Sequence, residues 1–127
     1  MKSRVLLVDD DPDVLDWLER ALGGVYSVER AESVAAAETA LSREAFVALI
    51  TDEHMPGARG VELCARARLL HPQMARILVS GFSDDPTLRA ALRSGDVHRL
   101  VVKPVESAIL RDVIEATVRA AAMKPSE

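Results

Sequence analysis

The sequence has little of several features that mark particular classes of protein. Its single cysteine, Cys64, allows no disulfide within the chain, which fits a reducing compartment, so we expect the cytoplasm. No apolar run approaches the roughly 20 residues that cross a bilayer. The opening stretch MKSRVLLVDD becomes acidic before the apolar core of a signal peptide could form. These features argue against a secreted protein and against an association with membranes.

Positive charge is also scarce, with 16 basic against 20 acidic residues and a net charge of −4. Nucleic-acid backbones are bound by clustered Lys and Arg, so we expect no direct contact with nucleic acid. The 127 residues are 49% apolar and 28% charged, an ordinary balance for one globular domain. We predict a single domain over residues 1–123 and a short C-terminal tail over 124–127.

Short apolar runs recur along the chain and predict strands. Most are continuous and rich in β-branched residues, as in strands buried on both faces. The run that begins at Tyr26 alternates with polar residues instead, which predicts an edge strand. The expected strands contain residues 5–8, 26–28, 46–50, 77–79 and 100–102.

The stretches between these runs have helical periodicity and recognisable ends. Asp11 is a predicted N-cap, with Pro12 at the first helical position, where a missing N–H costs nothing. Helices are expected from Pro12 to Gly23-Gly24, from Ser33 to about Arg43, from about Gly60 to Leu70, from Asp85-Pro86 to Ser94-Gly95, and through Ile109–Val118 to near Met123.

Strict alternation of strand and helix predicts an α/β fold with a parallel sheet covered by helices on both faces. Right-handed crossovers and an edge-like second strand favour the order 2-1-3-4-5, a flavodoxin-like doubly wound sheet with five flanking helices. In such sheets ligands bind beyond the C-terminal ends of the strands, where the strand order reverses. We therefore expect the functional site beside strands 1 and 3.

Chemically active side chains follow the buried runs. Asp9 and Asp10 come after the first, Asp52 after the third, Ser80 after the fourth and Lys103 after the fifth. Three converging carboxylates require a hard divalent cation, and Mg²⁺ takes one or two carboxylates while keeping positions for water and phosphate oxygens. A carboxylate beside Mg²⁺ and an ammonium can attack phosphorus. The set therefore suits the formation of an acyl phosphate.

Four motifs together resemble the signature of two-component response regulator receiver domains. They are VDDD at 8–11, TDEHMPG at 51–57, SG at 80–81 and KP at 103–104. They span nearly the whole chain in the order of that family. The segment SGDVHRLVVKP is similar to receivers attached to cyclic-di-nucleotide phosphodiesterase modules, which suggests that subgroup.

The resemblance implies a metal site for Mg²⁺. By position, Asp10 would bind the ion directly and Asp9 mainly through water. Asp52 and the backbone carbonyl of His54 would complete the protein ligands. Asp11, by contrast, is expected to cap a helix rather than bind metal.

The resemblance also assigns the phosphoryl chemistry. Asp52 corresponds to the phosphoacceptor, Ser80 to the switch hydroxyl and Lys103 to the lysine that contacts the phosphoryl group; the Lys103–Pro104 bond is cis in relatives. Leu100 stands where relatives commonly carry an aromatic switch residue. His54 and Phe82 would flank the acyl phosphate and could shield it from water.

The family implies a switch rather than an enzyme, apart from its own phosphorylation and autodephosphorylation. A sensor histidine kinase or a phosphotransfer protein would donate the phosphoryl group. The fourth helix, fifth strand and fifth helix would then change and regulate an output domain or partner protein. The same face could form a homodimer.

Two other functions use the same residues. The chain could be a docking module that is not phosphorylated, an alternative to which Leu100 leaves room. It could also be a small haloacid dehalogenase-like phosphatase, as Asp9-x-Asp11 suggests, although Asp13 departs from the pattern of that family. A flavin site is not expected, because three carboxylates would expel the flavin phosphate.

Overall fold

The computed structural model describes residues 2–81 and 85–123, so the predicted tail at 124–127 and Phe82 lie outside it. Within the described residues, five parallel strands form one sheet in the order β2-β1-β3-β6-β7. This confirms the predicted order, since β6 and β7 are the fourth and fifth long strands. The sheet comprises β1 (Arg4–Val8), β2 (Ser27–Ala31), β3 (Ala48–Asp52), β6 (Ala75–Ser80) and β7 (Arg99–Val102).

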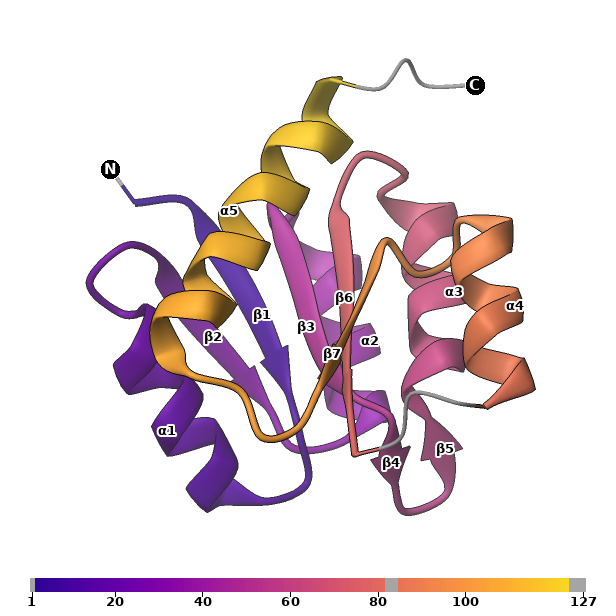
Figure 1. Ribbon diagram of the computed structural model, residues 1–127, viewed down its shortest axis with the longest axis horizontal. Coiled ribbons are helices and arrows are strands. Elements are labelled where there is room, and N and C mark those ends of the chain that lie inside the picture. The colour runs from indigo at the N-terminus through magenta and orange to yellow at the C-terminus, as the bar shows by residue number, and fades with distance from the viewer. Residues whose placement is uncertain (1, 82–84, 124–127) are drawn as a thin grey trace.

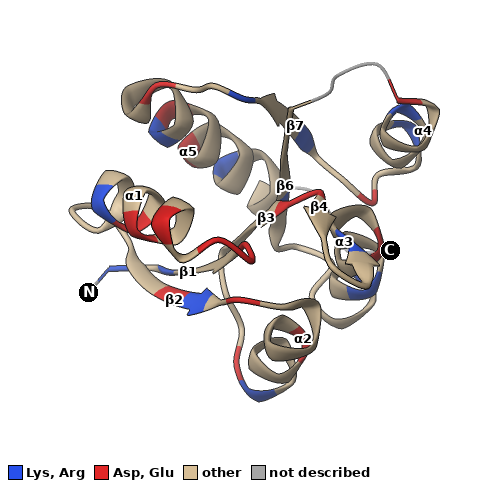
Figure 2. Cartoon of the chain, turned by 90° about the horizontal axis from the view of Figure 1, so that it is seen from below, with Lys and Arg blue, Asp and Glu red and all other residues tan. Residues whose placement is uncertain are grey.

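Helices cover both faces of this sheet (Figures 1 and 2). Helices α1 and α5 lie on one face, and α2, α3 and α4 lie on the other, as expected for a doubly wound fold. Their bounds are α1 (Pro12–Leu22), α2 (Val34–Arg43), α3 (Gly60–Leu70), α4 (Pro86–Ser94) and α5 (Ser107–Met123). None of these helices has the length and apolar character that would be needed to span a membrane.

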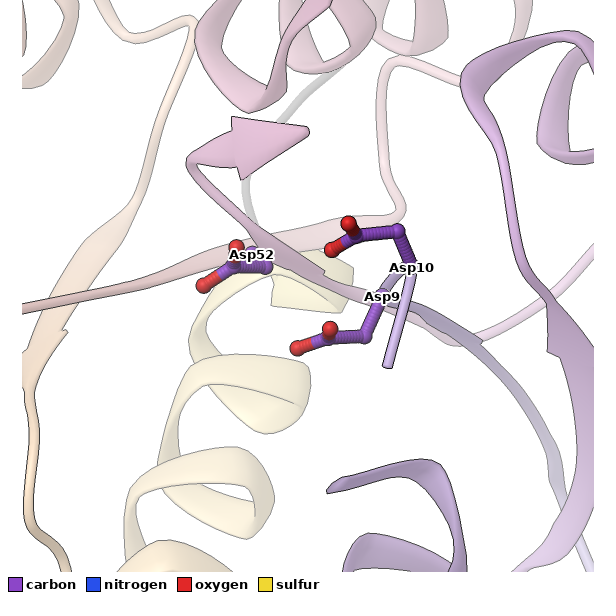
Figure 3. A group of neighbouring side chains, drawn as sticks. All are labelled: Asp9, Asp10 and Asp52. Atoms are coloured by element: carbon purple, nitrogen blue, oxygen red, sulfur yellow. The ribbon is translucent and has the colours of Figure 1, made fainter. Parts of the chain in front are cut away.

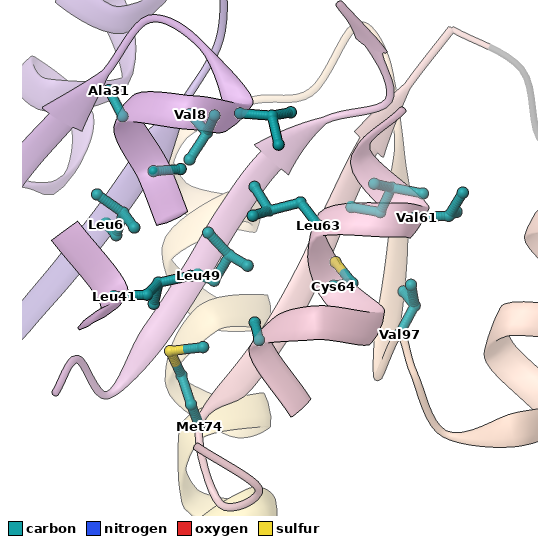
Figure 4. Packing of buried hydrophobic residues seen from close by; sticks show 14 of the residues in the cluster. Leu6, Val8, Ala31, Leu41, Leu49, Val61, Leu63, Cys64, Met74 and Val97 are labelled. Atoms are coloured by element: carbon teal, nitrogen blue, oxygen red, sulfur yellow. The ribbon is translucent and has the colours of Figure 1, made fainter. Parts of the chain in front are cut away.

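Alternating residues of the buried strands point into two separate hydrophobic clusters. Leu6 and Leu49 pack with α2, α3 and α4, as Figure 4 shows for part of that cluster. Leu7 and Ile50 pack on the other face with α1 and α5. Burial on both faces explains why these strands are continuously apolar in the sequence.

Several strands differ in their bounds from the predicted apolar runs. Strand β3 begins at Ala48 rather than Phe46, because Phe46 buries its ring in the core without joining the ladder, and it continues to Asp52, which pairs with Val79. Strand β2 runs from Ser27 rather than Tyr26. A short antiparallel hairpin, β4 (His54–Met55) and β5 (Ala58–Arg59), was not expected, because each strand is too short to have a period.

Arg76 is a charged residue inside a core strand, only 2% exposed. Its guanidinium donates hydrogen bonds to four backbone carbonyls before and after the strand, at 2.8–3.3 Å; the acceptors belong to Pro72, Met74, Gly95 and Asp96. These bonds replace the water that the guanidinium loses on burial. Arg76 thereby joins the segment before β6 to the segment before β7.

The single cysteine lies in the core. Cys64 of α3 is fully buried, and burial raises the pKa of its thiol to about 12. Since the thiolate is the reactive form, we expect the folded chain to resist Ellman's reagent and to react only after denaturant unfolds it. Rapid labelling of the native chain at neutral pH would contradict this expectation.

Candidate functional site

The C-terminal ends of β1 and β3 bring three carboxylates together. Ligand oxygens of Asp9, Asp10 and Asp52 all lie within 4.8 Å of one another, and Figure 3 shows the side chains of Asp9 and Asp10 extending toward the side on which Asp52 lies. Asp9 is 4% exposed and Asp52 is 7% exposed, whereas Asp10 faces solvent. The pairing of Val8 with Thr51 places these strand ends side by side. The predicted convergence is therefore present.

The surroundings of Asp9 disfavour the charged form of its carboxyl group. Burial raises the pKa of the Asp9 carboxyl from 3.8 to about 6. A hydrogen bond from the backbone N–H of Asp11 to Asp9 Oδ1, at 2.9 Å, opposes this shift, and the charges of Asp52 and Asp10 add to it. A bound cation would relieve the repulsion.

Asp11 does not belong to the carboxylate cluster. Its Oδ1 accepts a hydrogen bond from the backbone N–H of Asp13 at 2.9 Å, so it caps the N-terminus of α1 as predicted. Its charge also lies at the positive end of the helix dipole. The third aspartate of the VDDD motif thus has a structural role.

Lys103 contacts the proposed phosphoacceptor directly. Its Nζ lies 2.7 Å from Asp52 Oδ1, and its backbone N–H donates to the carbonyl of Ser80 at 2.8 Å. Ser80 is fully buried and ends β6, next to Val79, which pairs with Asp52. The Lys103–Pro104 peptide bond is cis. One end of the sheet therefore gathers a carboxylate, an ammonium and a hydroxyl.

His54 lies in β4, two residues after Asp52, and its side chain is exposed. Leu100 lies in β7, half-buried against the hydrophobic cluster that also contains Leu88 and Val97. An aliphatic side chain therefore packs where relatives commonly carry an aromatic one. The predicted roles of both residues stay predictions.

An apolar cavity of about 350 Å³ adjoins the carboxylates between α1 and the start of α5. Asp9, Asp52 and Lys103 lie at its wall, and the one tryptophan of the sequence, Trp17, lines it from α1. Trp17 also packs against the core. The apolar wall lowers the local dielectric, so charges at the site interact more strongly than they would in water.

Glu53 is a site neighbour that the sequence reasoning missed. It follows Asp52 directly, yet its side chain is fully buried and pairs with Arg59 of β5. Its Oε1 also accepts a hydrogen bond from the backbone N–H of Val61 at 3.0 Å. Nothing in the spacing of TDEHMPG distinguishes this buried carboxylate from a solvated one, because its partner Arg59 is placed by the hairpin.

These residues fit a hard divalent cation. The cluster offers oxygen ligands from two buried carboxylates and one exposed carboxylate, and Lys103 offsets only part of their charge. Carboxylate oxygens are the ligands that Mg²⁺ prefers. Asp9, Asp10 and Asp52 could hold the ion, which would supply a positive charge for anionic oxygens bound beside Asp52.

The raised pKa of Asp9 predicts an unusual dependence of stability on pH when metal is removed by a chelator. The folded chain binds the Asp9 proton more tightly than the unfolded chain, so this contribution to stability is lost as pH rises through about 6. Between about pH 5 and about pH 7.5 the loss should be about 1.4 kcal/mol. Urea unfolding of the wild type and of Asp9→Asn at both pH values measures it.

The Asp9→Asn variant serves as the reference, because it cannot gain a proton at this position. The unfolding free energy of the variant minus that of the wild type should therefore increase with pH, because only the wild type loses stability as Asp9 gives up its proton. A difference that is the same at both pH values would mean that Asp9 does not titrate in this range.

Comparison with known proteins identifies relatives along most of the chain. A family model, the response regulator receiver domain, matches residues 5–115. The transcriptional regulatory protein GlrR of Escherichia coli strain K12 is 32% identical over 126 residues, which cover 98% of this chain and 28% of GlrR. The response regulator receiver protein CpdR of Brucella abortus strain 2308 is 36% identical over 82 residues, covering 64% of this chain and 68% of CpdR. The hydrogenase transcriptional regulatory protein HoxA of Cupriavidus necator is 29% identical over 94% of this chain, which spans 25% of HoxA.

Solved structures with the same fold agree with these relatives. The chain in the crystal structure of adenylate cyclase from Rhodopirellula baltica has 30% sequence identity to this chain and superposes with a TM-score of 0.89. The match covers 95% of this chain and 90% of that chain. A response regulator receiver domain protein from Methanospirillum hungatei JF-1 is 26% identical, with a TM-score of 0.88 and coverage of 95% and 97%. The chain spans about a quarter of the length of several curated relatives.

Proposed function

Because this chain belongs to the family of response regulator receiver domains, we propose that it is a phosphorylation-dependent switch with Asp52 as its phosphoacceptor. The observation that carries the proposal is the position of the Asp52 carboxylate. Its Oδ1 lies 2.7 Å from Lys103 Nζ, and one of its oxygens lies within 4.8 Å of oxygens of Asp9 and Asp10. This arrangement combines a nucleophile with groups that can balance the charge of a phosphoryl group.

In the proposed reaction, a carboxylate oxygen of Asp52 attacks the phosphorus of a phosphohistidine. A P–O bond forms as the P–N bond breaks, and the electron pair of the broken bond leaves with the imidazole. Mg²⁺ held by Asp9, Asp10, Asp52 and the His54 carbonyl would neutralise phosphoryl oxygens. Lys103 stabilises the same charge from the end of β7.

Phosphorylation then adds a charge of about −2 to the site, part of which Mg²⁺ and Lys103 offset. The Ser80 hydroxyl, at the end of β6, donates to a phosphoryl oxygen, and the change passes to α4, β7 and α5. The equilibrium between the two arrangements exists beforehand, and the phosphoryl group only shifts it. A homodimer through this face is a further part of the proposal.

The partners we propose are a sensor histidine kinase or a phosphotransfer protein, and an output domain or partner protein. The curated relatives HoxA and GlrR are transcriptional regulators, so an output in transcription is one form that this regulation could take. The receiver subgroup attached to cyclic-di-nucleotide phosphodiesterase modules and the domain extent 1–123 stay predictions. We propose the cytoplasm as the compartment, since a single cysteine fits a reducing one.

Receiver domains are regulatory, and the position of Asp11 also disfavours a haloacid dehalogenase-like phosphatase. That enzyme would need Asp9 and Asp11 at one site, whereas the Asp11 carboxylate caps α1. A docking module without phosphorylation would leave the Asp52–Lys103 pair without a chemical role.

The direct test of the proposed function is phosphorylation by a small-molecule donor. We expect incubation with acetyl phosphate and Mg²⁺ to add the mass of one phosphoryl group to the intact chain. A chelator should prevent the addition. An unchanged mass with excess donor and Mg²⁺ would favour the docking module.

A further inference from the structure

The carboxylate of Glu53 is held from several directions directly beside the phosphoacceptor. It pairs with the Arg59 guanidinium, and its Oε1 accepts from the backbone N–H of Val61 at the start of α3. Its own backbone N–H donates to Val79 of β6, and its carbonyl accepts from the N–H of Gly60, both at 3.0 Å. A fully buried charge with these partners is costly to move, because any lost partner leaves it unsatisfied.

Arg59 links the buried Glu53 carboxylate to the start of α3 and to the start of α4. Its backbone N–H donates to Glu62 Oε1 at 3.0 Å, which fixes the start of α3. The Nε and Nη2 edge of its guanidinium pairs with Glu53, and the same Nη2 lies 3.3 Å from Asp85 Oδ2. A single side chain thus contacts the residue after Asp52 and the residue before α4. Figure 1 places the β4–β5 hairpin and the start of α4 at the same end of the sheet.

Asp85 is the N-cap of α4. Its Oδ1 accepts from the backbone N–H of Thr87 at 2.8 Å, while its Oδ2 faces Arg59. The hydrogen bond from Thr87 lowers the pKa of the Asp85 carboxyl, and the Arg59 charge adds to this effect. The carboxylate therefore stays ionised at neutral pH and holds the helix start toward Arg59.

We propose that Arg59 is a positioning residue that couples the hairpin after Asp52 to the start of α4, and that its contact with Asp85 favours the unphosphorylated arrangement. This inference rests on the proposed function. The contact exists in a structure in which Asp52 is an unmodified carboxylate paired with Lys103, so it is a contact that the unphosphorylated chain makes. A contact made in one arrangement and lost in the other shifts the equilibrium toward the first.

The two ion pairs of Arg59, with Glu53 and with Asp85, differ in burial, and this difference indicates which of them breaks. The Glu53 side chain is fully buried, whereas those of Arg59 and Asp85 are 38% and 31% exposed. When the start of α4 shifts on modification of Asp52, the Arg59–Asp85 contact can exchange for water. The Glu53–Arg59 pair cannot do so without leaving a buried charge unpaired. Arg59 therefore stays with the hairpin while α4 is released.

The test is a titration of the Mg²⁺-loaded chain with beryllofluoride, a mimic of the phosphoryl group, followed by Trp17 fluorescence. Trp17 reports on the site because it lines the cavity beside Asp52 and Lys103. Asp85→Asn removes the charge that attracts Arg59 but keeps an N-cap residue and leaves Glu53 paired. We expect this variant to respond at a two- to fivefold lower beryllofluoride concentration, about the effect of one partly exposed ion pair.

Three comparisons separate coupling from a general loss of structure. Glu38→Gln removes an exposed ion pair with Arg66 at 2.9 Å, away from the site, and should leave the midpoint unchanged. The Mg²⁺ midpoint without beryllofluoride should be the same in Asp85→Asn as in the wild type. Adding Asp85→Asn to Arg59→Gln should lower the beryllofluoride midpoint no further than Arg59→Gln alone.

An unchanged or higher beryllofluoride midpoint in Asp85→Asn, with a wild type that responds, would overturn the coupling and leave the proposed function intact. An additive effect of the two substitutions would also overturn it. A wild type that does not respond to beryllofluoride with Mg²⁺ would remove the proposed function and the coupling together.

Discussion

We expect the Asp52→Asn variant to gain no detectable phosphoryl group from acetyl phosphate and Mg²⁺ under conditions that fully label the wild type. The amide oxygen of asparagine is a poor nucleophile and carries no charge to attract the cation. The amide also loses the charge-assisted hydrogen bond that Lys103 makes to Asp52 at 2.7 Å. Intact-mass spectrometry measures the incorporated group directly.

The matched control for this variant is Asp13→Asn, which makes the same chemical change in the exposed first turn of α1. This control should be labelled like the wild type. The Asp52→Asn chain should also remain folded, because removing one charge from three crowded carboxylates relieves repulsion. If it kept its melting temperature and still gained a phosphoryl group, another residue would be the acceptor.

The second large effect is on stability and arises at Arg76, where we expect Arg76→Met to lower the free energy of unfolding by about 3–5 kcal/mol. Methionine fills much of the same volume but donates no hydrogen bonds. The carbonyls of Pro72, Met74, Gly95 and Asp96 would lose their guanidinium donor. Urea unfolding followed by Trp17 fluorescence measures the loss.

Two further variants define the cause of that loss. Arg66→Met, on the exposed surface of α3, should change stability by no more than about 0.5 kcal/mol. Arg76→Lys keeps the charge but cannot reach all four carbonyls with one ammonium, so it should also be clearly destabilised. A loss below about 1 kcal/mol in Arg76→Met would show that water replaces the guanidinium at little cost.

The ends of the helices could be predicted from the sequence because caps are local. Asp11, Ser33 and Asp85 each accept a hydrogen bond from a backbone N–H two or three residues later, so a few consecutive residues carry the signal. The predicted helix at 60–70 likewise matches α3. The strand ends were less accurate, since a strand continues only where a neighbouring strand offers partners, as Val79 does for Asp52.

The sequence by itself determined the fold class, the strand order and the convergence of Asp9, Asp10, Asp52 and Lys103. In a parallel sheet, residues that follow different strands meet at one edge, so the order of the chain is sufficient to place them together. It also determined that Asp11 caps a helix, because that contact spans two residues.

Only the tertiary structure decided how the remaining charges are used. Arg76 is buried because backbone carbonyls about 20 residues further along the chain fold over it. Glu53 is buried because a hairpin brings Arg59 to it, and Arg59 reaches Asp85, 26 residues further on. A sequence pattern gives the identity of a charge, whereas its desolvation and its partner depend on contacts between distant segments. The coupling that we propose between Asp52 and α4 therefore becomes visible only in the folded chain.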